Sequence, residues 1–172
     1  MFIHSKEFIY KNAKISYLYF RKSSPKKTLV CLHGFLEYKE IFEFIYSDFE
    51  ALDFSVICID LLGHGKSDCL GYLHTMEEQA DMIYELIKEL ELNTITILGH
   101  SMGGYIGLAF LELYSESVDT LILLNSSASE DSEIRKNNRL RGADLVKKNA
   151  SIFIQMAISN LFDKIYSIIK AN

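Results

Sequence analysis

The sequence predicts an α/β fold with a mostly parallel, doubly wound sheet, because strand-like apolar runs alternate with segments of helical periodicity. Two turns that contain glycine, at residues 33–35 and 99–104, directly follow such runs, as turns at the carboxyl ends of parallel strands do. The chain has 172 residues, of which 49% are hydrophobic. That length and composition suffice for one compact domain with a sizeable core.

Residues 1–124 contain the regular elements of this fold. The first two strands form a hairpin, and each later strand except the last is followed by a helix. The clearest helix opens with the capping box Thr75-Met76-Glu77-Glu78 and repeats apolar residues at helical spacing. The strands are expected at residues 2–10, 14–21, 28–32, 55–59, 95–98 and 118–124, and the helices at residues 38–52, 75–92 and 104–111.

The character of the sequence changes after residue 125. Residues 129–150 are polar and charged, and residues 151–170 are amphipathic, so two or more helices are expected there. We therefore divide the chain into a core, residues 1–127, and a helical region, residues 128–172. A basic run in this region lies on a solvated helix face, in the simpler interpretation, or faces an acidic group of a substrate. The run comprises Arg135, Lys136, Arg139 and Arg141.

Composition argues against several classes of function. The net charge of −5 gives no electrostatic reason to expect nucleic-acid binding, and no apolar stretch is long enough to span a membrane. Residues 1–7 lack the apolar core of a signal peptide. Cys31 and Cys58 fall in expected strands and Cys69 falls in a loop, without metal-ligand spacing. We therefore expect three reduced thiols in a cytoplasmic protein without a metal site.

The most specific local pattern is Gly-His-Ser-Met-Gly at residues 99–103. It lies between the apolar run 95–98 and a helix-like stretch, the context in which G-x-S-x-G forms a nucleophile elbow. Such a turn holds its serine, here Ser101, at positive φ and leaves no room for side chains at Gly99 and Gly103. The serine oxygen would then lie at a helix N-terminus, which favours negative charge. The alternative is a glycine-rich turn with an incidental serine.

A second pattern, His33-Gly34-Phe35, follows the expected strand at residues 28–32. Acyl transfer needs two backbone N–H donors directed at the oxyanion of the tetrahedral intermediate. Phe35 is placed to supply one of them and Met102, directly after the serine, the other. Gly34 lets the backbone come close. His33 is expected to order the loop by hydrogen bonding rather than to act in catalysis.

A third pattern, Asp-Leu-Leu-Gly-His-Gly-Lys-Ser at residues 60–67, follows the expected strand at residues 55–59. Its two glycines mark a tight loop. The pattern lacks the spacing of a phosphate-binding loop, so nucleotide binding is not expected. Asp60 and His64 are expected to be structural, capping the loop and fixing its turns.

In this order, the three patterns together resemble the α/β-hydrolase superfamily, and within it the serine esterase and lactonase-like branch. The resemblance covers about residues 1–130 and implies the N-terminal six strands of that fold with helices on both faces. It also implies a partial helical cap in residues 128–172. The reaction it implies is an acyl-enzyme formed at Ser101 from a small-molecule ester, thioester or lactone, without a cofactor. Related haloalkane dehalogenases carry Asp at the nucleophile position, and Ser101 argues against them.

The catalytic acid and histidine of the family have no counterpart in this sequence. The family carries them in the order Ser, acid, His, beyond the cap, whereas all five histidines here precede Ser101. His100 is adjacent to the serine, but strand alternation points its side chain away. The chain is therefore interpreted as the N-terminal part of a longer hydrolase or, alternatively, as a finished protein that has given up hydrolysis for binding or regulation.

Both interpretations leave an open edge of the sheet. An unpaired strand at such an edge promotes association, so we expect pairing or swapping with a second chain. We also expect the isolated chain to turn over esters very poorly. Without the histidine, the oxyanion hole and substrate binding alone leave only a small residual rate.

Overall fold

The computed structural model describes residues 5–25, 27–45, 48, 51 and 53–161 of the chain. Contacts divide the chain into two compact units, Met1–Ala128 and Ser129–Asn172. The first unit contains a six-stranded sheet, and the second contains two helices. Within the described part of the chain, every helix is too short or too polar to cross a bilayer.

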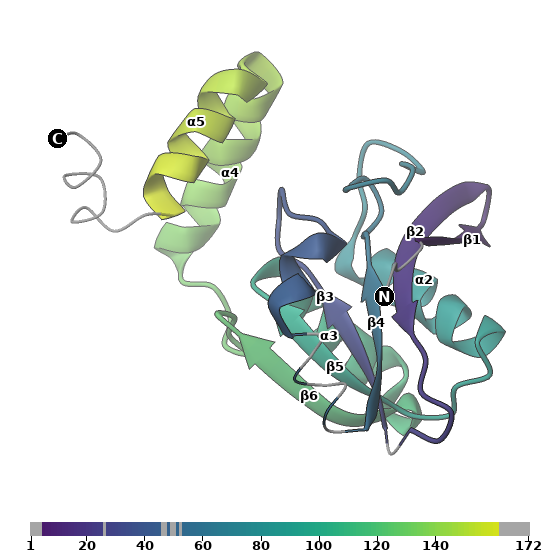
Figure 1. The fold of residues 1–172 in the computed structure, drawn as a ribbon. Helices are drawn as coiled ribbons and strands as arrows, with labels where there is room; N and C mark the ends of the chain where they lie inside the picture. Colours follow the sequence, from purple (N-terminus) through teal and green to yellow (C-terminus); the bar gives the residue numbers. More distant parts are fainter. Residues whose placement is uncertain (1–4, 26, 46–47, 49–50, 52, 162–172) are drawn as a thin grey trace, which may run out of the picture. The chain divides into compact units, whose positions relative to one another are not determined.

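The sheet of the first unit is mostly parallel, which confirms the predicted α/β class (Figure 1). Its strands are β1 (Lys6–Tyr10), β2 (Ala13–Phe20), β3 (Lys27–Leu32), β4 (Phe54–Ile59), β5 (Ile95–His100) and β6 (Val118–Leu124). They lie in the order β1-β2-β4-β3-β5-β6. β2 pairs antiparallel with both β1 and β4, whereas β4, β3, β5 and β6 run parallel to one another.

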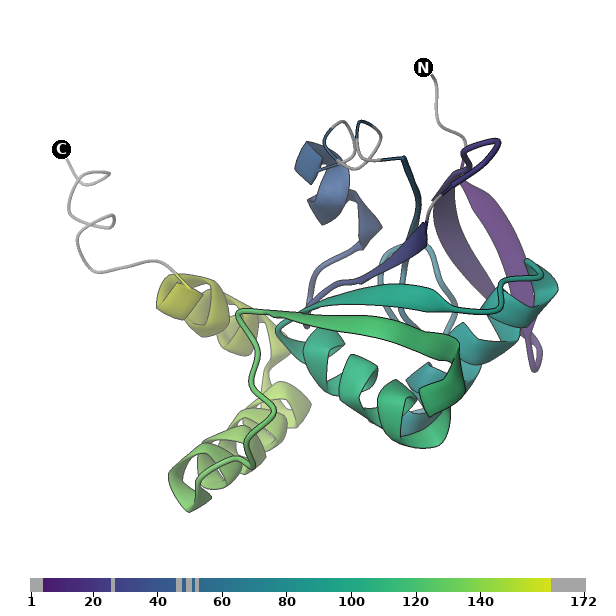
Figure 2. The same cartoon turned by 90° about the horizontal axis from the view of Figure 1, so that it is seen from below.

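Helices lie on both faces of this sheet, as predicted (Figure 2). The covering elements are α2 (Met76–Glu89), α3 (Met102–Leu113) and the short 3-10 helix η1 (Lys39–Ile45). α2 and α3 pack against each other on one face, and η1 packs on the other. Because side chains alternate along a strand, Val30 of β3 enters the larger core under α2 and α3. Its neighbour Cys31 enters the smaller core beside Phe42 of η1.

Helix α2 begins at the predicted capping box. Thr75 is its N-cap, and the Thr75 hydroxyl accepts a hydrogen bond from the backbone N–H of Glu78 at 3.1 Å. This bond satisfies one of the N–H groups left unpaired at the start of a helix. The apolar residues at helical spacing, such as Ile83 and Leu86, are fully buried. The periodicity therefore identified both the helix and the face that packs on the sheet.

The helix predicted at residues 38–52 is present, but its first part forms the 3-10 helix η1 and is not α-helical. The described residues Asp48 and Ala51 are α-helical, and the other residues of 46–52 lie outside the described residues. The aromatic and β-branched side chains of η1 lose rotamer freedom in an α-helix. Its first amide, on Lys39, also donates to the Asp60 carboxylate at 2.8 Å, which fixes the start of the segment from outside it.

The second unit contains the helices α4 (Glu133–Lys148) and α5 (Ala150–Leu161). No side chain of α4 is buried. Two of its basic residues pair with nearby acids, Lys136 with Glu130 at 2.5 Å and Arg139 with Asp131 at 2.7 Å. The basic run therefore lies on a solvated helix face, which is the simpler of the two interpretations. Residues 162–170 of the predicted amphipathic stretch lie outside the described residues.

Candidate active site

The carboxyl ends of β3 and β5 meet at the centre of the sheet. These strands are neighbours in space although β4 lies between them in the chain, because the chain passes from β3 to β4 on one side and returns through β5 on the other. Such a switch point opens a crevice at the carboxyl edge, where ligands bind in α/β proteins. Two of the sequence patterns follow these strands, at residues 33–35 and 99–103.

The turn after β5 holds Ser101 in a strained conformation. Its φ of 50° and ψ of −111° are unusual for a residue with a side chain. A Cβ at Gly99 would lie 2.5 Å from the Gly103 carbonyl oxygen, and a Cβ at Gly103 would overlap the Leu32 carbonyl. Glycine at both positions thus permits the tight turn and the close approach of α3 to the end of β3.

The Ser101 backbone is held by three hydrogen bonds. Its N–H donates to the Leu124 carbonyl at 2.9 Å, and its carbonyl accepts from the Gly104 N–H at 3.0 Å and from Ser126 Oγ at 2.9 Å. The carboxyl end of β6 therefore supports the turn. Met102 is the first residue of α3, so its amide belongs to the group of N–H donors without a helical partner. Ser101 Oγ has no hydrogen-bond partner among the described residues.

His33 is fully buried beneath the loop after β3, and both of its ring nitrogens are engaged. Nδ1 donates to the Gly34 carbonyl at 2.8 Å, and Nε2 accepts from the Leu61 N–H at 3.1 Å. Burial lowers the pKa of His33 to about 4, so the ring is neutral near pH 7. His33 thus joins the loop after β3 to the loop after β4 and has no nitrogen left for a serine.

The loop after β3 also approaches the elbow. A Cβ at Gly34 would lie 3.2 Å from Ser101 Cβ. Phe35, the next residue, is 52% exposed and its ring contacts His64 edge-on, with centroids 6.1 Å apart. The structure therefore brings the segment that carries the Phe35 amide next to Ser101 and the start of α3.

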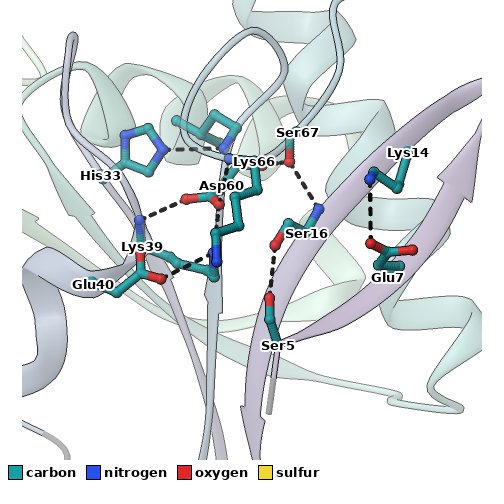
Figure 3. A network of polar contacts seen from close by, with 11 residues as sticks. Ser5, Glu7, Lys14, Ser16, His33, Lys39, Glu40, Asp60, Lys66 and Ser67 are labelled. Atoms are coloured by element: carbon teal, nitrogen blue, oxygen red, sulfur yellow. Dashed lines mark hydrogen bonds and ion pairs between the residues drawn. The ribbon is translucent and has the colours of Figure 1, made fainter. Parts of the chain in front are cut away.

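A buried ion pair anchors the loop after β4 (Figure 3). The Asp60 carboxylate accepts from the Lys39 ammonium at 2.6 Å, and both side chains are fully buried. The same carboxylate accepts from the Lys66 N–H at 2.9 Å, and His64 Nδ1 contacts the Leu62 carbonyl at 3.1 Å. These contacts confirm the structural roles expected for Asp60 and His64. They also link η1 to the loop.

No histidine of the described residues is hydrogen-bonded to Ser101 Oγ. His100 Nδ1 faces the Glu37 carboxylate at 2.8 Å, and His74 bonds to a residue of α2. His4 lies outside the described residues. The described part of the chain therefore places a serine at the carboxyl edge of the sheet without a base in contact with it.

Sequence reasoning missed Glu37 and Lys39. Glu37 Oε2 accepts from the Gly34 N–H at 2.6 Å, and a carboxylate three residues beyond a turn amide is too common a pattern to be diagnostic. Lys39 is fully buried although lysine is almost never so unless paired. Its partner is 21 residues away, and no local pattern marks such a pair.

The structure also contains a cavity that is separate from these residues. It has a volume of about 780 Å³ and is lined by residues of β1 and α2 and by Tyr114. Tyr114 donates to the Asp81 carboxylate at 2.6 Å, and this bond raises the pKa of Tyr114 to about 12. None of the residues predicted to act in acyl transfer lines this cavity.

A β1-β2-β4-β3-β5-β6 sheet with a strand–turn–helix serine after β5 is the architecture of an α/β hydrolase. The model of the alpha/beta hydrolase fold family matches residues 27–153. The chain belongs to this family, which confirms the resemblance drawn from its motifs.

Curated relatives of the chain are longer proteins. A putative 2-succinyl-6-hydroxy-2,4-cyclohexadiene-1-carboxylate synthase from Bacillus subtilis (strain 168) is 34% identical over 102 residues, which cover 58% of this chain and 36% of that protein. A serine hydrolase-like protein from Homo sapiens is 33% identical over 100 residues, or 57% of this chain and 49% of that protein. The chain thus spans less than half the length of either relative.

Solved structures support the same assignment. MGS-M2, an α/β hydrolase enzyme from a Medee basin deep-sea metagenome library, has a TM-score of 0.84 at 17% identity, covering 96% of this chain and 60% of that chain. At this identity the similarity shows the fold alone. A thermophilic esterase from Thermogutta terrifontis has a TM-score of 0.72 at 28% identity, covering 88% of this chain and 56% of that chain. Together the comparisons agree on the α/β-hydrolase fold.

Proposed function

We propose that this chain acts as a serine hydrolase that forms an acyl-enzyme at Ser101 from a carboxylic ester, thioester or lactone of a small molecule. The observation that carries the proposal is the Ser101 turn: a strained serine at the N-terminus of α3, beside a second backbone loop. Strain of this kind is kept where function requires the geometry. The helix N-terminus favours the negative charge that develops on the attacked carbonyl oxygen.

In the proposed reaction Ser101 Oγ attacks the carbonyl carbon, and a histidine takes its proton. The amides of Phe35 and Met102 donate to the oxyanion, and Gly34, Gly99 and Gly103 allow the backbone segments to approach. The protonated histidine returns the proton to the leaving alcohol or thiol. Water then attacks the acyl-enzyme and releases the acid and free Ser101. No described histidine contacts Ser101 Oγ, so we propose that a histidine outside the described residues supplies the base.

The alternative is that the chain is catalytically incomplete and serves to bind or regulate. This alternative is favoured by one observation: among the described residues, Ser101 Oγ has no hydrogen-bond partner that could act as a base. An elbow without a base retains its backbone donors and its crevice, and these can bind a carbonyl compound without turning it over.

The cysteines bear on where the protein works. Cys31 and Cys58 are buried, Cys69 is exposed, and all three are free. We propose a cytoplasmic location, because a reducing compartment keeps such thiols reduced.

Intact-mass analysis after treatment with a fluorophosphonate tests the proposed function. We expect a single covalent adduct that forms slowly on the wild-type chain, through the elbow and its backbone donors, and that is lost in Ser101→Ala. Ser115→Ala is the matched control, because it removes an exposed hydroxyl at the other end of α3 and should leave the adduct unchanged. No adduct on the folded wild-type chain would contradict acyl-enzyme formation and favour the binding or regulatory alternative.

Turnover is a separate measurement. We expect the 172-residue chain to hydrolyse p-nitrophenyl acetate at most about 10³-fold faster than the uncatalysed rate, since that is the residual effect of the oxyanion hole and substrate binding in a serine protease without its triad. Fast hydrolysis that disappears in Ser101→Ala would contradict this expectation and reveal a base within the chain.

A further inference from the structure

A single carboxylate joins the two halves of the candidate site. Glu37 Oε2 accepts from the Gly34 N–H at 2.6 Å and lies 2.8 Å from His100 Nδ1. Gly34 belongs to the loop after β3, and His100 is the last residue of β5, directly before Ser101. The Glu37 and His100 side chains are only 25% and 19% exposed. Partial burial and the carboxylate charge both strengthen hydrogen bonds of this kind.

The bridge lies where loop and elbow come closest. A Cβ placed on Gly34 would lie 2.9 Å from Glu37 Oε2 and 3.2 Å from Ser101 Cβ. Both backbone segments contain a strained residue. Leu36, in the loop after β3, has a φ of 62°, and Ser101, in the elbow, has a φ of 50°. A turn with a non-glycine residue at positive φ relaxes unless surrounding contacts hold it, and the Glu37 bridge is such a contact.

We propose that Glu37 is a positioning residue for the reaction at Ser101, holding the loop that carries the Phe35 amide against the elbow. The inference rests on the proposed function. Because Glu37 accepts from the Gly34 N–H, that amide is engaged, and the proposed oxyanion donor is the amide of the next residue, Phe35. The His100 ring donates to the carboxylate and so reduces the repulsion that a bare negative charge would exert on a developing oxyanion.

His100 is not itself the base in this arrangement. Its Nδ1 is directed at Glu37, and no hydrogen bond joins the ring to Ser101 Oγ among the described residues. Two further histidines lie near the loop: His33 is engaged through both nitrogens, and His64, whose ring contacts Phe35, is directed through Nδ1 at the Leu62 carbonyl. Glu37 and His100 therefore act on the reaction through the backbone segments that they connect.

The first test measures the bridge without using the reactivity of Ser101. Hydrogen exchange of the Gly34 amide is followed by NMR in the ¹⁵N-labelled 172-residue chain. Glu37→Ala removes the acceptor, so exchange should become about tenfold faster. Glu37→Gln retains a carbonyl oxygen at the same reach and should restore most of the protection. Glu43→Gln, which removes an exposed carboxylate of η1, should change nothing. Unchanged Gly34 exchange in Glu37→Ala overturns the bridge.

The second test measures the consequence for Ser101. The rate constant of fluorophosphonate labelling should fall about tenfold in Glu37→Ala at a nearly unchanged melting temperature, with Glu37→Gln in between. A merely structural residue would lower the melting temperature and leave the labelling rate of the folded chain unchanged, and that result overturns the positioning role. If wild type is not labelled at all, the proposed function and the positioning role fail together, whereas the exchange experiment still decides the bridge.

Discussion

β5 and β6 are neighbouring parallel strands with similar apolar sequences, but β5 is buried in the sheet whereas β6 is partly exposed. β5 has a strand on each side, and its first five residues are buried. β6 is paired only with β5 among the described residues, and Ile122 and Leu124 are each 39% exposed. An apolar run therefore predicts a strand, whereas its burial depends on neighbours that the run does not specify.

The difference matters for the candidate site because both strands support it. β5 ends at the residue before Ser101, and the Leu124 carbonyl at the end of β6 accepts from the Ser101 N–H at 2.9 Å. The serine turn thus stands between a fully packed strand and an edge strand. We expect mutations on the β5 side to act through the core and mutations on the β6 side to act through association.

A matched pair of truncations provides the largest expected contrast. Ile97 in β5 is fully buried, whereas Ile122 in β6 is 39% exposed. Ile97→Ala leaves a cavity and should lower the free energy of unfolding by about 3 kcal/mol, while Ile122→Ala should lower it by less than about 1 kcal/mol. Urea denaturation of the two variants and wild type measures both values. Equal losses would show that β6 is packed as tightly as β5.

The pH dependence of stability tests the burial of His33 in the packed part of the sheet. Burial lowers the pKa of His33, at the end of β3, from 6.5 to about 4. The unfolded chain therefore takes up this proton at a higher pH than the folded chain does. The contribution of neutral, buried His33 to the free energy of unfolding is therefore fully present above about pH 6.5 and is lost as the pH falls towards 4. The lowered pKa of His33 corresponds to about 3 kcal/mol of this free energy.

Urea denaturation between pH 7 and pH 4 measures this dependence. His33→Gln should be less stable at pH 7, because the hydrogen bond to the Leu61 N–H is disturbed, but its stability should fall less steeply with acid. His74→Gln, on a histidine outside the sheet, is the control and should retain the steep fall. If the free energy of unfolding of His33→Gln falls with acid as steeply as that of wild type, groups other than His33 cause the acid sensitivity.

The features predicted from sequence are those whose causes lie close together in the chain. β6 was placed to the residue, and the Thr75 cap and the positive φ of Ser101 each follow from residues within a few positions. The contacts that were missed join distant residues: Lys39 to Asp60 across 21 positions, and Glu37 to His100 across 63. Their spacing in the chain carries no information about their approach. The pairing of β3 with β4 brings Lys39 and Asp60 together, and the pairing of β3 with β5 brings Glu37 and His100 together.

Self-association of the chain tests the edge of the sheet at β6 most directly. The substitutions that test it should have the smallest effect on folding. We propose that the open edge of β6 pairs with a second copy of the chain. The opposite edge strand, β1, is short and carries two charged residues, whereas β6 carries a single charged residue, Asp119, which pairs with Lys27. Charges on an edge oppose pairing, so β6 is the edge that associates.

Sedimentation velocity over a range of protein concentrations measures this association. Wild type should sediment faster as its concentration rises, and Ile122→Lys should remain monomeric, because a lysine on the strand blocks pairing. The matched control is Ile9→Lys on β1, where Ile9 is 65% exposed; it should associate as wild type does. Both substitutions lie on exposed positions, so the free energy of unfolding should change by less than about 0.5 kcal/mol. A monomeric wild-type chain, or association blocked equally by both substitutions, would contradict pairing through β6.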